Sequence, residues 1–392
     1  MQNDEAAGAI ASYSKIAEAL CKEIRAGVYS NEESFPSLTK IMQRFGVSRP
    51  SAVRSVAELK HLGLVTTRKG AGTFISQKNR TIGLAIPGTA DSEFFSAIMD
   101  GLVFNCNKYG MDLVAGDIFA VDHDERDKQA ERLARHFASV GVAGVIMQPV
   151  GFSENANQFN GIISDILDKA GIPVVLVDYD IATPPGRSKY DLVAIDNFGA
   201  GRKVAAHLLK VGAKRICCLL RRLCAESVHT RFAGVDAEVF RTTGRHASVV
   251  VGEPTDGKAV AAALKKFRPD AIVCSNDIAA GWLVKTLKKL GVAVPGDVMV
   301  TGFDDVRVAA RTRPSLTSVR QPCFEIADMA FKALLERMAD SNLPPREILL
   351  DTTLVVRKST TPSHRRASVG TDPTHRWGQT LRNPDFSVIF CR

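Results

Sequence analysis

The stretch from Phe35 to Ile75 decides the fold of the amino-terminal part of the chain and reads FPSLTKIMQRFGVSRPSAVRSVAELKHLGLVTTRKGAGTFI. Ser37 precedes apolar residues at helical spacing, so its side chain is expected to cap a first helix. Gly46 is expected to end that helix, because glycine adopts the left-handed conformation without steric strain. Ser48 can cap a second helix, and Pro50 is tolerated in its first turn. The stretch therefore predicts two short helices joined by a tight turn.

A short hairpin is expected next, with strands over residues 64–68 and 73–76 around a basic, glycine-rich tip at residues 69–72. On the second helix, helical spacing predicts a buried stripe of Val53, Val56, Leu59 and Leu62. The residues expected to face outward are Arg49, Ser51, Ala52 and Ser55. Two helices followed by a hairpin are the arrangement that places one helix in the DNA major groove.

The charge of this stretch fits a nucleic-acid partner. Residues 36–77 hold one acid, Glu58, against seven basic residues, a net charge of +6: Lys40, Arg44, Arg49, Arg54, Lys60, Arg68 and Lys69. A basic patch on a small helical module is the electrostatic signature of binding to a phosphate backbone. Most charge runs are simply solvated surface. Here charge, turn residues and helix order coincide, which favours DNA binding.

Residues 11–75 resemble a GntR-type winged helix. The matching residues are Tyr13, Ile16, Leu20, Ile24, Gly27, Pro36-Ser37, Phe45 to Arg49, Glu58-Leu59, Gly63-Leu64, Gly70 and Gly72 to Phe74. In the family an arginine opens the recognition helix, a role that falls to Arg49, whereas Thr39 and Val53 stand where arginines are common. The residues expected to contact DNA are Ser37, Lys40, Ser48, Arg49, Ser51, Arg54, Arg68, Lys69, Gly70 and Gly72.

Length and composition indicate a protein of two or three soluble domains, with 392 residues and 45% hydrophobic content. The polar, acidic start lacks the pattern of a secretory signal, and no apolar run reaches the ~18–20 residues of a membrane helix. The eight cysteines form no CxxC pair. They are therefore expected to be reduced core residues, and the protein is expected to be cytoplasmic, without a membrane partner.

Beyond a short polar linker at residues 77–80, strand-length apolar runs alternate with amphipathic helical segments. Strands are predicted over residues 81–86, 112–115, 144–147, 173–177, 192–195, 215–219, 248–251, 271–274 and 298–301. Helices are predicted over residues 94–108, 125–140, 199–211, 230–242, 258–267 and 278–290. Strict alternation predicts parallel sheets covered on both faces. The strands are too many for one compact half, so two α/β lobes are expected.

Polar residues follow most of these strands, and ligands bind open α/β sheets beyond the carboxyl ends of strands. Any one of them could simply cap the next helix, as Asn276 could. Their repetition at strand after strand favours a binding site, at which Phe94 and Phe95 could stack on a sugar ring. Asp304 is expected at the lobe interface, where it can accept hydrogen bonds from hydroxyls. Arg231, in the second lobe, is expected to face it across the cleft.

Residues 80–359 resemble the LacI/GalR-type effector domain, which is itself similar to periplasmic sugar-binding proteins. The resemblance is carried by Asp91-x-Glu93-Phe94-Phe95, Asp196-Asn197, Arg231-Phe232-Ala233-Gly234, Ser275-Asn276-Asp277, Gly302-Phe303-Asp304-Asp305 and residues 314–322, in the family's order. It implies effector contacts from Phe94, Phe95, Asp178, Arg231, Asn276, Asp304 and Gln321. Tyr179 replaces an arginine of many sugar-binding relatives. A winged helix in front of this domain is the architecture of arabinose-type repressors.

Enzyme motifs are not matched. Gly199-Ala200-Gly201 is similar to the start of a dinucleotide loop, but the third glycine is missing, and no GxSxG, HExxH or P-loop sequence occurs. The acidic residues around His123 could suggest a metal site. Their place at the start of a helix favours a structural role, because acids complement the helix dipole there. No catalytic residue, cofactor or metal site is predicted.

The predicted fold class is α/β, with a winged helix-turn-helix at residues 1–76, a linker at 77–80 and a two-lobed, periplasmic-binding-protein-like (type I) domain with parallel sheets at 81–359. Residues 360–392 form a basic tail without apolar periodicity, expected to be disordered. The predicted protein is a ligand-responsive transcriptional regulator, a repressor of sugar uptake or catabolism genes. A homodimer would bind a pseudo-palindromic operator, and a polyhydroxylated effector, a sugar, would shift its geometry.

The sequence leaves two alternatives open. One is a purine- or nucleoside-type effector in the same class of regulator. The other is a sugar-binding or sugar-modifying protein that does not regulate transcription. Operator binding separates the regulator from the second alternative.

Overall fold

The computed structural model describes residues 2–25, 28–29, 35–61, 64–68, 72–75, 80–86, 93–117, 123–151 and 154–361. The predicted hairpin tip at Lys69 and Gly70 and residues 362–392 of the predicted tail lie outside these ranges. The chain forms two compact units: unit 1 comprises residues 1–195 and 322–350, and unit 2 comprises residues 196–321 and 351–392. Each unit is therefore built from discontinuous parts of the sequence.

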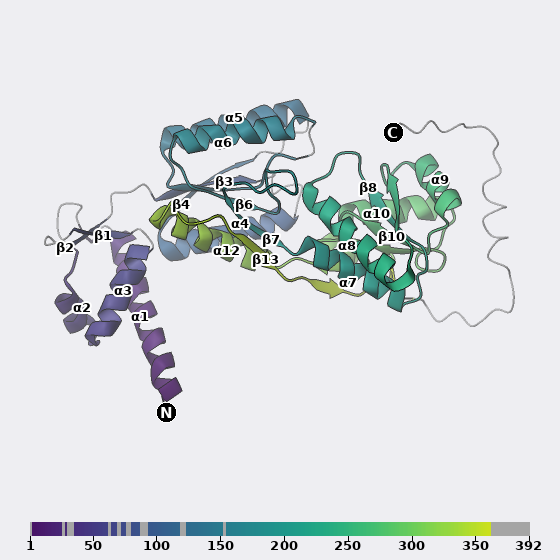
Figure 1. Cartoon of the computed structure of the whole chain (residues 1–392). Helices are drawn as coiled ribbons and strands as arrows, with labels where there is room; N and C mark the ends of the chain where they lie inside the picture. Colours follow the sequence, from purple (N-terminus) through teal and green to yellow (C-terminus); the bar gives the residue numbers. More distant parts are fainter. Residues whose placement is uncertain are drawn as a thin grey trace. The chain divides into compact units, whose positions relative to one another are not determined.

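The predicted winged helix is present at the start of unit 1 (Figure 1). Its elements are α1 (Gln2–Arg25), α2 (Leu38–Phe45), α3 (Arg49–His61), β1 (Val65–Arg68) and β2 (Gly72–Ile75). The Ser37 side chain accepts a hydrogen bond from the backbone N–H of Lys40 at 3.3 Å, and Gly46 ends α2 with a φ of 63°. β1 and β2 pair antiparallel. The cap at Ser37, the turn at Gly46 and the pairing of the hairpin strands are confirmed, and the Ser48 hydroxyl lies 3.2 Å from the Ser51 hydroxyl.

The buried face of α3 differs from the predicted stripe. Ala52, Ser55 and Leu59 are fully buried, whereas Val53 is 44% exposed. The reason is the packing of α3 against α1, which small side chains allow. The Ser55 hydroxyl donates to the backbone carbonyl of Tyr13 at 3.1 Å, so its burial leaves no unpaired polar group. The predictions that Ala52 and Ser55 face outward and that Val53 is buried are therefore wrong.

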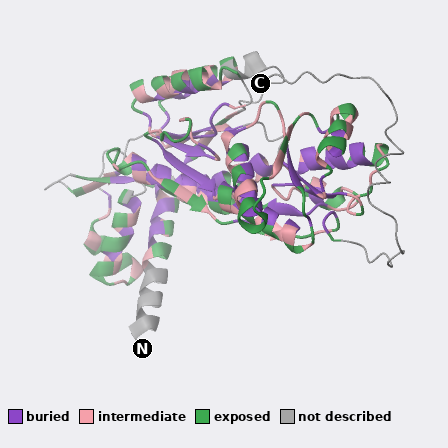
Figure 2. Cartoon of the chain, turned by 45° about the vertical axis from the view of Figure 1, so that its right-hand side comes forward, coloured by how far each residue is buried: buried purple, intermediate pink, exposed green. Residues whose placement is uncertain are grey.

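The rest of unit 1 is built on a parallel sheet with the strand order β13-β7-β6-β5-β3-β4. In Figure 1, α5 and α6 lie on one face of this sheet, and α4 and α12 lie on the other. The central strands are buried along their length, as Figure 2 shows and as a sheet covered on both faces requires. The strands are β3 (Thr81–Ile86), β4 (Asp112–Asp117), β5 (Gly144–Met147), β6 (Val174–Val177), β7 (Asp191–Ile195) and β13 (Glu347–Leu350), and the helices are α4 (Glu93–Tyr109), α5 (His123–Val140), α6 (Ala156–Lys169) and α12 (Cys323–Ala339).

A buried ion-pair cluster attaches α12 and β13 to this sheet. Asp191, at the start of β7, is fully buried. Its carboxylate accepts hydrogen bonds from Arg337 of α12 at 2.7 and 3.0 Å and from Arg346 at 2.8 Å. Burial opposes ionisation, but the hydrogen bonds from the two arginines outweigh it and lower the pKa of Asp191 to about 2. A segment that returns from unit 2 is thereby fixed to unit 1 by charge-assisted bonds.

Unit 2 is built on a second parallel sheet, with the order β11-β10-β8-β9. Its helices α7 and α8 pack so closely that a Cβ atom added at Gly234 would lie 2.0 Å from the Phe198 carbonyl oxygen, so this position requires glycine. The strands are β8 (Ile216–Leu220), β9 (Ser248–Val251), β10 (Ala271–Cys274), β11 (Met299–Thr301) and the antiparallel pair β12 (Ser318–Arg320) and β14 (Thr353–Val355). The helices are α7 (Asn197–Lys210), α8 (Glu226–Thr243), α9 (Gly257–Phe267), α10 (Asp277–Lys289) and α11 (Arg307–Arg311).

The fold of unit 2 continues past residue 359. Thr360 is fully buried, and its hydroxyl lies 2.7 Å from the Thr317 hydroxyl and 2.8 Å from Nε2 of His207. The neighbouring Ser359 hydroxyl donates to the Val300 carbonyl at 2.6 Å. The predicted boundary at residue 359 is therefore too early, because the described part of unit 2 continues to residue 361.

The described cysteines agree with the predicted reduced state: all are free, and five of them are buried. None of the helices within the described ranges has both the length and the hydropathy of a membrane span.

Candidate effector and DNA-binding sites

Both parallel sheets share one topological feature: the first strand lies between the second and the third. In unit 1, β3 lies between β4 and β5, and in unit 2, β8 lies between β9 and β10. In open parallel sheets, ligands bind beyond the carboxyl ends of the strands at such a point, where neighbouring connections leave the sheet in opposite directions. The predicted effector contacts divide between the two units: Phe94, Phe95 and Asp178 belong to unit 1, and Arg231, Asn276, Asp304 and Gln321 belong to unit 2.

In unit 1, two phenylalanines lie at the start of α4, after β3. Phe94 and Phe95 are 7% and 9% exposed, and their rings meet edge to face with centroids 4.8 Å apart. This pair contributes to the core of unit 1 and leaves little of each ring for a ligand. The prediction that they form a stacking surface therefore depends on the small exposed part of each ring.

The loops after β5 and β6 are joined by two side-chain hydrogen bonds. Gln148 donates from Nε2 to the Asp178 carboxylate at 2.8 Å, and the Tyr179 hydroxyl donates to the Pro149 carbonyl at 2.8 Å. Asp178 has a φ of 77°, a conformation that costs a residue other than glycine about 1–3 kcal/mol and is common at functional sites. Gln148 thus orients Asp178, a role that its position after a strand could not reveal.

In unit 2, Arg231 of α8 is buried and held by three other residues. Its Nη1 donates to the Ser275 carbonyl at 2.6 Å, and its Nη2 donates to Oδ1 of Asn197 at 3.0 Å. Its Cζ atom lies 3.3 Å from the centroid of the Phe303 ring, a cation–π contact. These contacts fix the orientation of the guanidinium. The sequence marked Asn197 and Phe303 as parts of motifs but not as supports of Arg231.

Asp304 follows β11 beside this arginine. Its φ is 92°, and it accepts a hydrogen bond from Nε2 of Gln321 at 2.6 Å. Removal from water raises the pKa of Asp304, and the charge of Arg231 and the Gln321 hydrogen bond offset this only in part. The structure thus brings three predicted effector residues together. Because Arg231 and Asp304 both belong to unit 2, the prediction that they face each other from opposite lobes is wrong.

Two polar residues at the carboxyl end of β10 have structural partners. Oδ1 of Asn276 accepts a hydrogen bond from the Ala279 N–H at 2.9 Å, so Asn276 caps α10, as the simpler interpretation predicted. Asp277 is fully buried and accepts hydrogen bonds from the Ser318 hydroxyl at 2.6 Å and the Val306 N–H at 2.9 Å. Burial, and then the neighbouring Asp304, raise the pKa of Asp277 to about 8.

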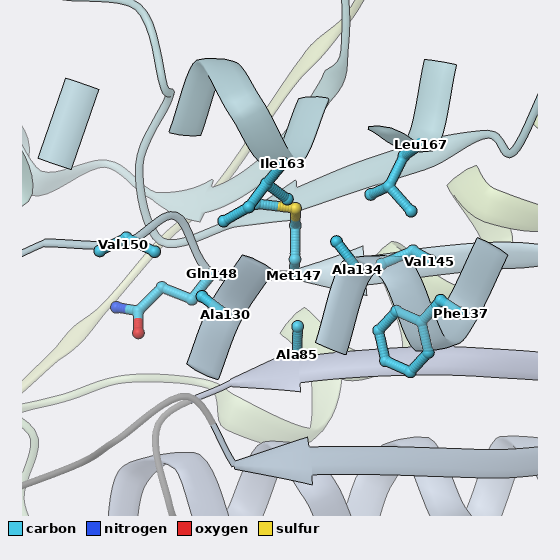
Figure 3. A pocket seen from close by; sticks show the side chains of 10 residues that line it. All are labelled: Ala85, Ala130, Ala134, Phe137, Val145, Met147, Gln148, Val150, Ile163 and Leu167. Carbon is cyan, nitrogen blue, oxygen red and sulfur yellow. The ribbon is translucent and has the colours of Figure 1, made fainter. Parts of the chain in front are cut away.

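Two small internal cavities are packing spaces rather than effector sites. The cavity in Figure 3 has a volume of about 10 Å³ and lies in the core of unit 1. Its lining is apolar except for Gln148, whose amide points away from the other side chains in Figure 3. The second, of about 20 Å³, lies in unit 2 near α9 and is lined by apolar residues and Glu253. Spaces of this size hold at most about one water molecule.

The predicted DNA contacts lie mainly on the surface of the winged helix. Ser37, Lys40, Ser48, Arg49, Arg54 and Gly72 are exposed, and Ser51 is half-buried. Gly72 has a φ of 111°, which favours glycine at this position of the hairpin. Lys69 and Gly70 lie outside the described residues, and the side chain of Arg68 is likewise not described.

The cations of this domain fall into two groups. Arg44 forms hydrogen bonds and an ion pair with Glu23 of α1, including one bond of 2.8 Å, and this raises the pKa of Arg44 above its usual range. Arg44 therefore holds α2 to α1. Within the described residues, Arg49 and Arg54 of α3 have no carboxylate partner, which leaves their charge available to a phosphate backbone.

Comparison with known proteins agrees with this division. The family model of bacterial regulatory proteins of the gntR family matches residues 12–75, and that of the periplasmic binding protein-like domain matches residues 205–360. The HTH-type transcriptional repressor PurR of Yersinia enterocolitica is 30% identical over 287 residues, 71% of this chain and 80% of that protein. The PurR of Vibrio vulnificus is 29% identical over 291 residues, with 71% and 80% covered.

Solved structures share the fold. The transcription regulator GntR from Chromobacterium violaceum is 26% identical with a TM-score of 0.57, over 72% of this chain and 99% of that chain. The transcriptional regulator CelR in complex with cellobiose is 23% identical with a TM-score of 0.60, over 83% and 100%. The chain belongs to the family of HTH-type transcriptional repressors, and it joins a GntR-family DNA-binding domain to a LacI-type, periplasmic-binding-protein-like effector domain.

Proposed function

We propose that this regulator is a cytoplasmic repressor whose effector is a small polyhydroxylated molecule, a sugar. The observation that carries the proposal is the cluster of Arg231, Asp304 and Gln321 in unit 2. Its amide, guanidinium and carboxylate groups can donate to and accept from hydroxyls, and hydrogen bonds to charged groups of this kind contribute about 1.5–3 kcal/mol each.

A purine-type effector is the second candidate, because the two relatives compared above are named PurR. Thermal shift of the full chain against pentoses, hexoses, disaccharides, purine bases and nucleosides separates the candidates. A ligand at one hundred times its Kd stabilises its target by about 2.7 kcal/mol, which a melting curve resolves. A shift with sugars only supports the first candidate. A shift with purines only contradicts it.

The effector is expected to act on DNA binding through the geometry of a homodimer. A ligand can shift such an equilibrium only by the difference between its affinities for the two states. Titration of a selected DNA duplex with and without the ligand found above measures that difference. Equal DNA affinity in both conditions would contradict effector control.

The homodimer is supported by an exposed edge strand. β9 ends the sheet of unit 2, and on it Val249 and Val251 are 53% and 60% exposed. An edge strand with unpaired backbone groups and exposed apolar side chains is a site for pairing with another chain. We expect Val249→Lys to give a monomer by light scattering at micromolar concentration. The matched variant Val140→Lys, at a 43% exposed valine of unit 1, should stay dimeric, and a dimeric Val249→Lys protein would exclude β9 from the interface.

A further inference from the structure

The exposed face of α3 has a pattern that the predicted DNA contacts do not include. Arg49, Val53, Ala57 and Lys60 are all exposed, and their spacing of four, four and three residues places them along one face of the helix. The opposite face, with Ala52, Ser55 and Leu59, is buried. The outward face therefore has a cation near each end and small apolar side chains between them.

Val53 is unusual in this setting. Its side chain is 44% exposed. It lies next to Arg49 and Arg54, two arginines that have no carboxylate partner among the described residues and whose charge favours binding of this helix to a phosphate backbone. Its side chain can neither donate nor accept a hydrogen bond. In the DNA major groove, the group that an apolar side chain can recognise is the C5-methyl of thymine, which adenine, guanine and cytosine lack.

We propose that Val53 contacts a thymine methyl group in each half of the operator and so selects thymine at that position. The inference rests on the DNA-reading role of α3. Arg49 and Arg54 would supply contacts to phosphates or to a base edge, which position the helix. Contact between Val53 and the thymine methyl group would then add specificity, because it shields both apolar groups from water.

The test uses the full chain and synthetic duplexes. A binding duplex is first selected from a random-sequence pool, and each thymine is then replaced in turn by deoxyuridine, which differs only in the missing methyl group. We expect one thymine in each half-site whose replacement weakens binding about four-fold at fixed salt, a factor that corresponds to about 0.8 kcal/mol, the transfer free energy of one methyl-sized group. Val53→Ala should bind the thymine and deoxyuridine duplexes equally at that position.

Two further variants test whether the preference for thymine belongs to Val53 itself. Val28→Ala changes a valine of the same domain that is 60% exposed and lies outside α3, and it should retain the preference for thymine over deoxyuridine. Val53→Arg should shift the base selected at that position from thymine to guanine, because arginine pairs with the guanine edge. A selected duplex that tolerates deoxyuridine everywhere, or a preference that survives Val53→Ala, would overturn the role of Val53 alone. Failure to select any duplex would overturn the DNA-reading role of α3 as well.

Discussion

The guanidinium of Arg231 lies against the ring of Phe303, with its Cζ atom 3.3 Å from the ring centroid. Phe303 directly precedes Asp304, so the residue that supports the arginine also fixes the start of the turn that carries the carboxylate. The left-handed conformation of Asp304 is maintained by the hydrogen bond from its N–H to the Val319 carbonyl at 2.8 Å. The two charged groups of the candidate site are thus oriented by one short segment of chain.

The first prediction follows from this arrangement. Arg231→Lys should weaken binding of the ligand identified by thermal shift ten-fold or more, because a lysine cannot donate to Asn197 and Ser275 at once in the same planar geometry. Asp304→Ala should have a similar effect through the loss of a charge-assisted hydrogen bond. Calorimetry measures both, and DNA binding by the ligand-free variants should be unchanged.

A matched control for these variants is Asp351→Asn. Asp351 belongs to the same unit, but its side chain is 84% exposed and paired with Lys203, so ligand affinity should stay at the wild-type value. If Arg231→Lys and Asp304→Ala also respond to ligand at wild-type concentrations, the cluster is not the effector site.

The second prediction concerns the start of α3. Arg49→Ala should weaken binding to the selected duplex by about 1–3 kcal/mol, the contribution of one good bidentate contact to a base. Arg44→Ala is the comparison, because Arg44 pairs with Glu23 and should affect stability more than DNA affinity. Titration at fixed salt is the measurement. Unchanged affinity in Arg49→Ala would remove Arg49 from the DNA-reading surface.

The third prediction concerns the buried cluster around Asp191. Asp191→Asn should destabilise unit 1 by about 3–5 kcal/mol, because Arg337 would keep a buried charge without a carboxylate partner. The folded-state pKa of Asp191 is about 2, below the ordinary aspartate value of 3.8, so its ionic contribution is present above pH 3.8 and is lost as the pH falls toward 2. Urea unfolding followed between pH 2 and pH 7 should show this loss in the wild type and not in Asp191→Asn.

The fourth prediction concerns Asp277, whose pKa shift has the opposite sign. Its folded-state pKa of about 8 exceeds the ordinary aspartate value of 3.8, so the folded protein retains a proton that the unfolded chain releases. The contribution of this group to stability therefore falls as the pH rises from about 4 to 8, by at most about 1.4 kcal/mol per pH unit. Asp277→Asn carries no titratable group there, so its urea midpoint should decline less between pH 5 and pH 8 than that of the wild type. Parallel declines would show that Asp277 is ionised in the folded protein.

The fifth prediction concerns the carboxyl terminus. A chain that ends after Thr361 should melt at the wild-type temperature, because residues 362–392 lack the apolar periodicity to join a core. A chain that ends after Lys358 should be destabilised by several kcal/mol. It would lose the hydrogen bonds of Ser359 to Val300 and of Thr360 to Thr317, and would leave buried partners unpaired. Equal melting temperatures for the two truncations would place the end of the fold before Ser359.

Local patterns in the sequence determined most of the elements of this protein. The helix cap at Ser37, the left-handed Gly46 and nine of the ten strands described in the two parallel sheets follow from turn chemistry and apolar periodicity, which act within a few residues of each other. The strands lie within two residues of their predicted bounds. The predicted effector residues Arg231, Asp304 and Gln321 were identified from motifs that lie at strand ends or helix starts.

Only the tertiary structure decided how these elements and residues pair. The exposed position of Val53 depends on which face of α3 packs against α1, and periodicity alone could not distinguish neighbouring stripes on a helix of 13 residues. β12, β13 and β14 are strands of three or four residues that pair with partners far along the chain, so no local signal marks them. Long-range packing also decides which side chains support the charged groups. Phe303 lies against Arg231, and Arg337 and Arg346 surround Asp191, although these residues are far apart in the sequence. The same holds for the hydroxyls of Thr317 and Thr360, which lie side by side in the fold but have no local signal that pairs them.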